Sequence, residues 1–185
     1  MKSLLGAEEM VASNDLEKLA RKETFRLEIE AEFLAAMNKG YAAMDKPKKG
    51  AIVELPGSKL VPPYTRGPWK VVDFYLVSTL SQYSGGMTII SYQGVPVWMM
   101  QYFGEYEEAA IPCLKAALRT AYAEKVFLNG RGPRSFWHDG YRYRNMPTIV
   151  PRNRFPQGSF EGTEEIEDAE GKRCGWHNYQ GGLMV

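Results

Sequence analysis

The first regular pattern of apolar and polar residues predicts a long helix over residues 14–39. Asn14 and Glu17 have the spacing of a capping box, in which two side chains satisfy backbone N–H groups at a helix N-terminus. Gly40 follows as a C-terminal stop, and a drift in the spacing allows a break near Thr24. The apolar positions are Leu16, Leu19, Phe25, Leu27, Phe33, Leu34 and Met37.

The rest of the chain predicts strands, with one more helix between them. Residues 45–67 are rich in proline and are expected to form a long loop with a short strand at residues 51–55. A second helix is expected over residues 108–125, where apolar residues share one helical face and Pro112 lies in the first turn. The remaining strands are expected at residues 69–80, 87–92, 95–103, 135–138, 141–146, 164–168 and 173–179, with a loop at residues 149–159.

An internal repeat is the strongest sign of how the chain is organised. When the sequence is shifted by about 77 residues, glycines at turn positions fall on glycines, and a strand–turn–strand pattern recurs in each half. Chance could produce one or two such matches, but five make a duplication the better explanation. The matching pairs are Gly85 with Gly162, Ile89 with Ile166, Gly94 with Gly171, Tyr102 with Tyr179, and Gly104 with Gly181.

The repeat predicts an α+β fold. One helix and three strands bury too little apolar surface to fold alone, so we expect two duplicated helix–three-strand units. They would form a mainly antiparallel sheet with two helices packed on it and an N-terminal helix extension. The expected single domain spans residues 1–185, with the extension at 1–32, repeat one at 33–106 and repeat two at 107–185. An antiparallel, barrel-like sheet that wraps a helix is the alternative.

Several short motifs resemble a known family. They are Gly85-Gly86, the segment from Gly94 to Gly104, Arg131-Gly132-Pro133, and the final pattern from Phe160 to Ile166 with Tyr179-x-Gly181-Gly182. Together they resemble the bacterial domain of unknown function 5680, over roughly residues 33–183. The resemblance implies a sensing or interaction module, because members stand alone or follow helix-turn-helix domains in regulators. It implies no catalytic residues, and residues 1–32 are too short for a helix-turn-helix domain.

Composition and charge narrow the class of protein. Apolar residues make up 44% of the chain and charged residues 24%, which is typical of a globular domain. The net charge of +1 gives no overall attraction to nucleic acid. The N-terminus lacks the pattern of a signal peptide, no segment is long and apolar enough to span a bilayer, and the two cysteines suit a reducing compartment. We therefore expect a cytoplasmic protein without a membrane partner.

Motifs for metals, cofactors or nucleophiles are weak. Cys174 and His177 are three residues apart on an expected strand, so they should face opposite sides, whereas a zinc centre needs converging ligands. Cys113 could meet His138 or His177 only through the fold. We expect no metal and no cofactor. Glu165 belongs to an acidic run of residues. A solvated edge strand is a simpler interpretation of this run than a pair of catalytic carboxylates.

Aromatic side chains give the most specific hypothesis about a site. Trp98 and Tyr102 share one strand face, and His177 and Tyr179 share the matching face in the second repeat, where Gly175 replaces the tryptophan. With a hairpin nearby, these side chains could line a pocket for a planar or cationic small molecule, or they could form a packed core. The candidate ligand-binding residues are Trp98, Tyr102, Arg131, Trp137, Tyr141, Tyr143, Glu165, His177 and Tyr179.

Three functions remain open at this point. The first is a non-enzymatic module that senses a small ligand or binds a partner through an aromatic-lined surface. The second is a protein-binding or immunity-type module, and a homodimer through the N-terminal helix is compatible with either. The third is a small enzyme that uses Glu165, His177 or tyrosines, which would require His177, His138 and a carboxylate to converge in one cleft.

Overall fold

The computed structural model describes residue 18 and residues 23–40, 48–148 and 158–185 of the chain. The capping box expected at Asn14 and Glu17 and most of the loop expected at residues 149–159 lie outside these ranges. Within the described part, no helix is long and apolar enough to cross a membrane.

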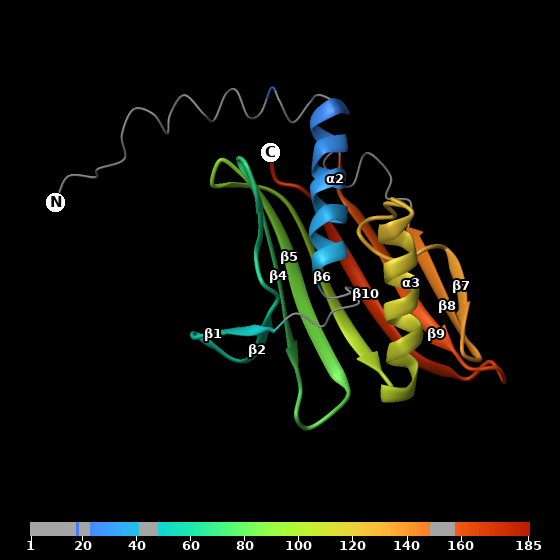
Figure 1. Cartoon of the computed structure of the whole chain (residues 1–185). Coiled ribbons are helices and arrows are strands. Elements are labelled where there is room, and N and C mark those ends of the chain that lie inside the picture. The colour runs from blue at the N-terminus through green and yellow to red at the C-terminus, as the bar shows by residue number, and fades with distance from the viewer. Residues whose placement is uncertain (1–17, 19–22, 41–47, 149–157) are drawn as a thin grey trace.

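The architecture is one antiparallel sheet of ten strands (Figure 1). The strands follow each other across the sheet in the order β1-β2-β4-β5-β6-β10-β9-β8-β7, and β3 pairs with β4 beside this path. Strands β6 and β10 therefore lie side by side at the centre, although they are far apart in the sequence. The strands are β1 Gly50–Ile52, β2 Leu55–Leu60, β3 Tyr64–Arg66, β4 Trp69–Val77, β5 Tyr83–Tyr92, β6 Val95–Tyr106, β7 Ser135–His138, β8 Tyr141–Thr148, β9 Phe160–Glu167 and β10 Arg173–Leu183.

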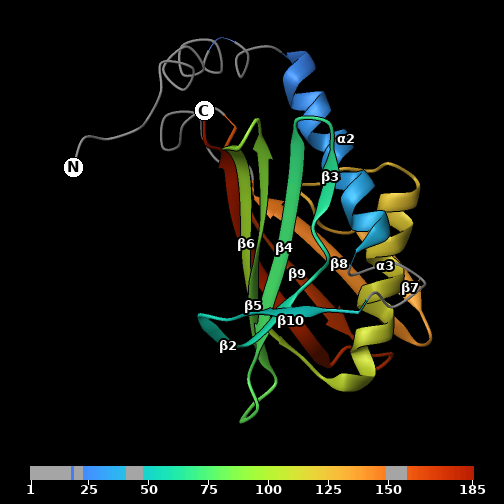
Figure 2. The same cartoon turned by 60° about the vertical axis from the view of Figure 1, so that its left-hand side comes forward.

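Helices cover one face of this sheet (Figures 1 and 2). Helix α2 spans Glu23–Lys39, and α3 spans Ile111–Ala123 directly after the short 3-10 helix η1, Glu108–Ala110. Their buried side chains join those of the inner sheet face in a single hydrophobic core, in which Phe33 of α2 packs on Trp98 of β6 and on Tyr122 of α3. The opposite face of the sheet, called the open face below, carries no helix in the described residues.

The expected α+β fold of helix–three-strand units is wrong. The chain is mostly β-structure, with ten strands and only α2 and α3 as α-helices in the described part. Six strands precede η1 and four follow it, so the two halves are not equal units. The extra strands, β2 and β3, come from residues 45–67, where the sequence had predicted a long loop with only a short strand at residues 51–55. Proline is compatible with strand positions that make no ladder hydrogen bond, and Pro56 lies exposed near the start of β2, outside the residues of β2 that pair with β4.

The central strands place two tyrosines opposite each other. Tyr102 of β6 pairs with Tyr179 of β10, Gly86 of β5 lies beside Tyr102, and Gly162 of β9 lies beside Tyr179. Each tyrosine ring covers its neighbouring glycine, where a Cβ atom would meet the ring. The matching glycines of β5 and β9 are therefore 76 residues apart, not 77 as the sequence comparison had it, and the repeat itself stays a prediction.

Candidate functional site

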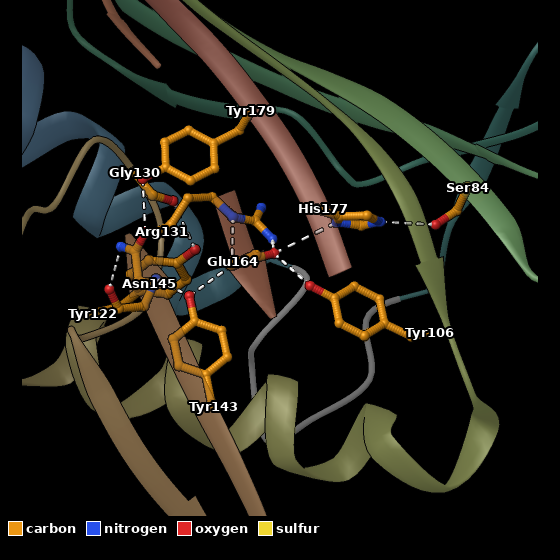
Figure 3. Close-up of polar contacts among 11 residues, drawn as sticks. Ser84, Tyr106, Tyr122, Gly130, Arg131, Tyr143, Asn145, Glu164, His177 and Tyr179 are labelled. Carbon is orange, nitrogen blue, oxygen red and sulfur yellow. Dashed lines mark hydrogen bonds and ion pairs between the residues drawn. The ribbon is translucent and has the colours of Figure 1, made fainter. Parts of the chain in front are cut away.

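A buried polar cluster lies between the sheet and the helices (Figure 3). At its centre is Glu164 of β9, which is fully shielded from solvent. Its Oε2 accepts hydrogen bonds from Nε of Arg131 at 3.0 Å and from the hydroxyl of Tyr143 at 2.6 Å. Its Oε1 accepts from the hydroxyl of Tyr106 at 2.9 Å and forms an ion pair with the guanidinium of Arg131. The carboxylate is thus surrounded by donors on both oxygens, as a buried charge requires.

Burial keeps the tyrosine hydroxyls of this cluster protonated. Burial raises the pKa of Tyr143 well above its ordinary range and that of Tyr179 to about 12, so both hydroxyls remain protonated. The hydroxyl of Tyr179 donates to Oδ1 of Asn145 at 2.7 Å, and the amide of Asn145 donates to the carbonyl of Gly132 at 2.8 Å. The guanidinium of Arg131 also lies 5.0 Å from the ring centre of Tyr102, a cation–π distance.

Glycine residues let the aromatic rings of the cluster lie across neighbouring strands. Gly104 of β6 separates Ser84 of β5 from His177 of β10, and Nε2 of His177 reaches over it to Oγ of Ser84 at 3.2 Å. Gly175 likewise faces the ring of Tyr106, whose hydroxyl reaches Glu164. A side chain at either glycine would occupy the space of the ring, so these glycines are required by close packing.

Ser84, His177 and Glu164 have the order of a hydrolytic triad. Nδ1 of His177 is 3.5 Å from Oε1 of Glu164, and because an unprotonated Nδ1 would be repelled by the carboxylate, the proton belongs on Nδ1 and Nε2 accepts from Ser84. Burial, together with the positive charge of Arg131, lowers the pKa of His177 to about 2. Such a weakly basic imidazole is a poor general base near neutral pH. The arrangement therefore suits a structural contact better than nucleophilic catalysis.

The convergence needed for the enzyme hypothesis is incomplete. Nε2 of His138, on β7, lies 3.2 Å from Oδ2 of Asp139, and the His138 ring stacks near Phe136. His138 is therefore not part of the contacts around His177. Cys174 is buried at an irregularity in the pairing of β10 with β9, so it does not simply alternate with His177 as the sequence predicted. In the part of the chain that the structure describes, no group of three or more His, Cys, Asp or Glu residues could hold a metal ion.

The candidate ligand-binding residues divide between buried and exposed positions. Five belong to the interior around the cluster: Tyr102, Arg131, Tyr143, His177 and Tyr179. Trp98 packs in the core against the rings of Phe33 and Phe160. Tyr141 is half-buried and lies against the same core. The structure therefore brings most of the expected residues together, but as a packed interior.

The two other candidates do not join the cluster. Glu165 lies on the open face, where it accepts from Arg144 at 2.5 Å. Trp137 of the edge strand β7 is exposed, with the guanidinium of Arg142 at 5.7 Å from its ring. Neither side chain can contribute to a pocket on the inner face.

Another buried carboxyl lies on the inner face, next to β5. Asp73 of β4 accepts a hydrogen bond from Thr88 at 2.9 Å, and burial raises its pKa to about 6. A carboxyl whose folded pKa exceeds its unfolded value near 4 stabilises the fold below pH 4, and this contribution is lost as the pH rises through 6.

We expect Asp73→Asn to remove this pH dependence. The amide keeps an acceptor for Thr88 but carries no charge to bury. The variant should match the parent near pH 4 and exceed its free energy of unfolding by about 3 kcal/mol at pH 8, since each pKa unit between about 4 and about 6 corresponds to about 1.4 kcal/mol. Urea unfolding across this pH range measures the difference. Parallel pH profiles for the two proteins would contradict the assignment of Asp73.

A hollow lies on the open face, with a volume of about 700 Å³. It spans the centre of the sheet, from β4 to β8, and its floor includes the backbone of Gly86 and Gly162 with the tyrosines that cover them. Its side-chain walls are formed by Phe74, Leu76, Met87, Gln101, Phe103, Thr148, Glu161, Thr163, Asn178 and Gln180. This volume is within the range of small-molecule sites.

The hollow has two chemically different sides. On the side of β4, β5 and β6 its wall consists of Phe74, Leu76, Met87 and Phe103 and is apolar except for the amide of Gln101. On the side of β8, β9 and β10 its wall consists of amides, hydroxyls and the carboxylate of Glu161. Phe103 is 56% exposed although it is a large apolar residue. An amphipathic molecule fits such a surface, because each part would meet a wall of its own kind.

None of the hollow's side-chain walls had been proposed from the sequence. Strand alternation could have revealed them, because residues 101 and 103 must face away from Tyr102. The missing information was which of the two faces the helices cover. The sequence held one further signal. Gln101 and Phe103 alternate with buried residues, and an aromatic residue such as Phe103 is unusual at a solvent-facing strand position.

Similarity to a known protein family extends over both the buried cluster and the hollow. A family model described as "Domain of unknown function (DUF5680)" matches residues 73–184. This segment contains every residue of the buried cluster and of the hollow. No curated protein and no solved structure matches the chain.

Proposed function

Because the chain belongs to the DUF5680 family of domains, whose function is unknown, we propose its role from the geometry: it binds an amphipathic small molecule in the hollow of the open face. The observation that carries the proposal is the division of this hollow into an apolar and a polar wall. The proposal keeps the non-enzymatic sensing role expected from the sequence but moves the site to the opposite face of the sheet.

The size and exposure of the hollow support a small ligand. A volume of about 700 Å³ accommodates a molecule of drug or metabolite size. Phe103 is stacked on Tyr83 with ring centres 5.4 Å apart, so the aromatic side chain at the rim is already held in place. A rigid apolar surface contributes to affinity because little side-chain entropy is lost on binding.

The lining also restricts the charge of the ligand. Glu161 is the only charged side chain among the described residues that line the hollow. The amides of Gln101, Asn178 and Gln180 can donate and accept hydrogen bonds. A ligand whose polar end is neutral or positively charged is therefore favoured, and an anionic end would lie near Glu161 without a compensating cation.

The buried cluster supports the hollow from behind. Tyr179 lines the hollow's floor and is fixed by Asn145, and Tyr102 lines it beside the guanidinium of Arg131. Binding sites hold their geometry when their residues are supported by packing and by further hydrogen bonds. The polar interior would thus stabilise a preformed binding surface. Both cysteines are free and buried, which supports the further proposal of a reducing, cytoplasmic setting.

We expect Phe103→Ser to weaken binding of an uncharged apolar probe about tenfold, because a partly buried phenyl ring contributes on the order of 1.4 kcal/mol to binding. The probe is N-phenyl-1-naphthylamine, whose fluorescence rises in an apolar environment. Trp137→Ser is the matched control, since Trp137 is also an exposed aromatic residue on a sheet strand but lies outside the hollow.

Displacement of the probe tests the polar side of the hollow in the same experiment. Octylammonium should displace the probe at a lower concentration than octanoate, and Glu161→Gln should reduce this preference. The proposal is wrong if the probe does not bind, or if Phe103→Ser and Trp137→Ser bind it as well as the parent protein does.

A further inference from the structure

One continuous part of the chain contains no charged residue. Residues 74–104 include no Asp, Glu, Lys, Arg or His, although charged residues make up 24% of the whole sequence. This segment covers the end of β4, all of β5, and β6 as far as Gly104. It supplies the entire apolar wall of the hollow. The absence of charge is therefore tied to one place in the fold, the hairpin of β4 and β5 with the adjoining strand.

Apolar side chains continue from this wall to the tip of the hairpin. Leu80, in the turn between β4 and β5, is 96% exposed, and Figure 1 shows this turn projecting beyond the rest of the sheet. Val77 and Tyr83 flank the turn and are also exposed. Tyr83 stacks on Phe103 at the rim of the hollow. We call Leu76, Val77, Leu80, Tyr83 and Phe103 the apolar track.

We propose that the apolar track docks on the surface of a lipid bilayer, so that the hollow can exchange an amphipathic ligand with the membrane. This inference rests on the function proposed above. A ligand with an apolar body is scarce in water and concentrated in lipid, because its apolar surface is driven out of water. A binding protein for such a ligand gains from contact with the phase that holds it.

The chemistry of the hairpin tip favours lipid over a protein partner. Its side chains are aliphatic or are the uncharged polar residues Ser78, Thr79, Ser81 and Gln82, with Tyr83 at its base. Tyrosine is enriched where membrane and water meet. Specific protein partners are commonly selected by complementary charges, and the tip offers none. Sequence composition alone predicted no membrane contact, because no long apolar segment is present; the exposure of Leu80 became visible only in the fold.

Vesicle binding tests this proposal with the full chain. The protein is sedimented with vesicles of pure phosphatidylcholine, at low and at high salt. We expect binding that does not weaken with salt, since no charges of the tip contribute. Leu80→Ser should lower the bound-to-free ratio about tenfold, because a leucine side chain would leave the lipid. The matched control is Val53→Ser, which removes another highly exposed apolar side chain, at the turn between β1 and β2.

The outcomes separate this inference from the proposed function. Probe binding without vesicles reports on the hollow alone, and Leu80→Ser should leave it unchanged. Loss of sedimentation in Leu80→Ser but not in Val53→Ser supports membrane docking. Failure of the parent protein to sediment overturns it, as does an equal loss in both variants. If light scattering shows a dimer that Leu80→Ser dissociates while vesicles bind nothing, the track is covered by a second copy and the membrane proposal is wrong.

Discussion

Arg131→Met should lower the free energy of unfolding by about 3–5 kcal/mol, since removing one partner of a buried ion pair leaves the other charge uncompensated. Glu164 is fully buried, and Arg131 supplies both of its charged contacts. The hydroxyls of Tyr106 and Tyr143 would remain, but they carry no charge. Because a domain of this kind is stable by about 5–15 kcal/mol in total, the loss is large. Chemical unfolding in urea measures it.

A second substitution distinguishes the charge from the packing. In the double variant Arg131→Met with Glu164→Leu, no charge remains in the buried cluster, and much of the stability should return, as it does when buried ion pairs are replaced by apolar residues. Lys172→Met is the control, because it removes an exposed ion pair with Glu107 and should leave the unfolding midpoint unchanged. A midpoint for Arg131→Met that equals the control would show that the cluster does not hold a charged carboxylate.

Gly104→Ala should destabilise the fold by about 3 kcal/mol or more, because the added methyl group has no space. A Cβ atom at this position would lie 2.7 Å from Cδ2 of His177 and would clash with the backbone carbonyl of Trp176. Real Cβ atoms are essentially never found closer than 3.0 Å to such neighbours. A backbone contact cannot be relieved by a rotamer change, so β6 and β10 would have to separate, and overpacking of this kind is costly.

The effect of this substitution can be separated from the general effect of removing a glycine. Gly50→Ala in β1 is the matched control, since its nearest neighbours are 3.9 Å or more from the added atom, and it should change the free energy of unfolding by no more than about 0.5 kcal/mol. Thermal unfolding of both variants gives the comparison. Equal stability of Gly104→Ala and Gly50→Ala would mean that the central strands are not packed as described.

The sequence was informative where strands follow one another through tight turns. Asp139-Gly140 correctly indicated the hairpin of β7 and β8, and both residues have positive φ angles, as this turn type requires. Prolines misled the interpretation of residues 45–67, because Pro56 lies near the start of β2, outside the residues that pair with β4, where a residue that cannot donate a hydrogen bond is tolerated. The balance of helix and sheet could not be judged from patterns that predicted neither β2 nor β3.

The hollow was not among the residues expected from the sequence for a different reason. The aromatic face with Trp98, Tyr102 and Tyr179 was correctly placed on one side of the sheet, but strand alternation does not say which side a helix will cover. Tyr102 and Phe103 are both aromatic and adjacent, so the sequence alone gives neither a preference for the interior. Glu164 stands among exposed carboxylates in an acidic run, and only the position of Arg131 in the fold explains its burial.

The position of β10 between β9 and β6 has a consequence for how the protein is made. A ribosome releases the chain from its N-terminus onward, so β6 emerges long before the strand that completes its pairing. Until residues 173–183 are available, the nascent protein presents β6 as an unpaired edge, within the stretch that has no charged residue to discourage association. Slow translation upstream of residues 173–183, or a premature stop that removes them, should therefore favour aggregation over partial folding.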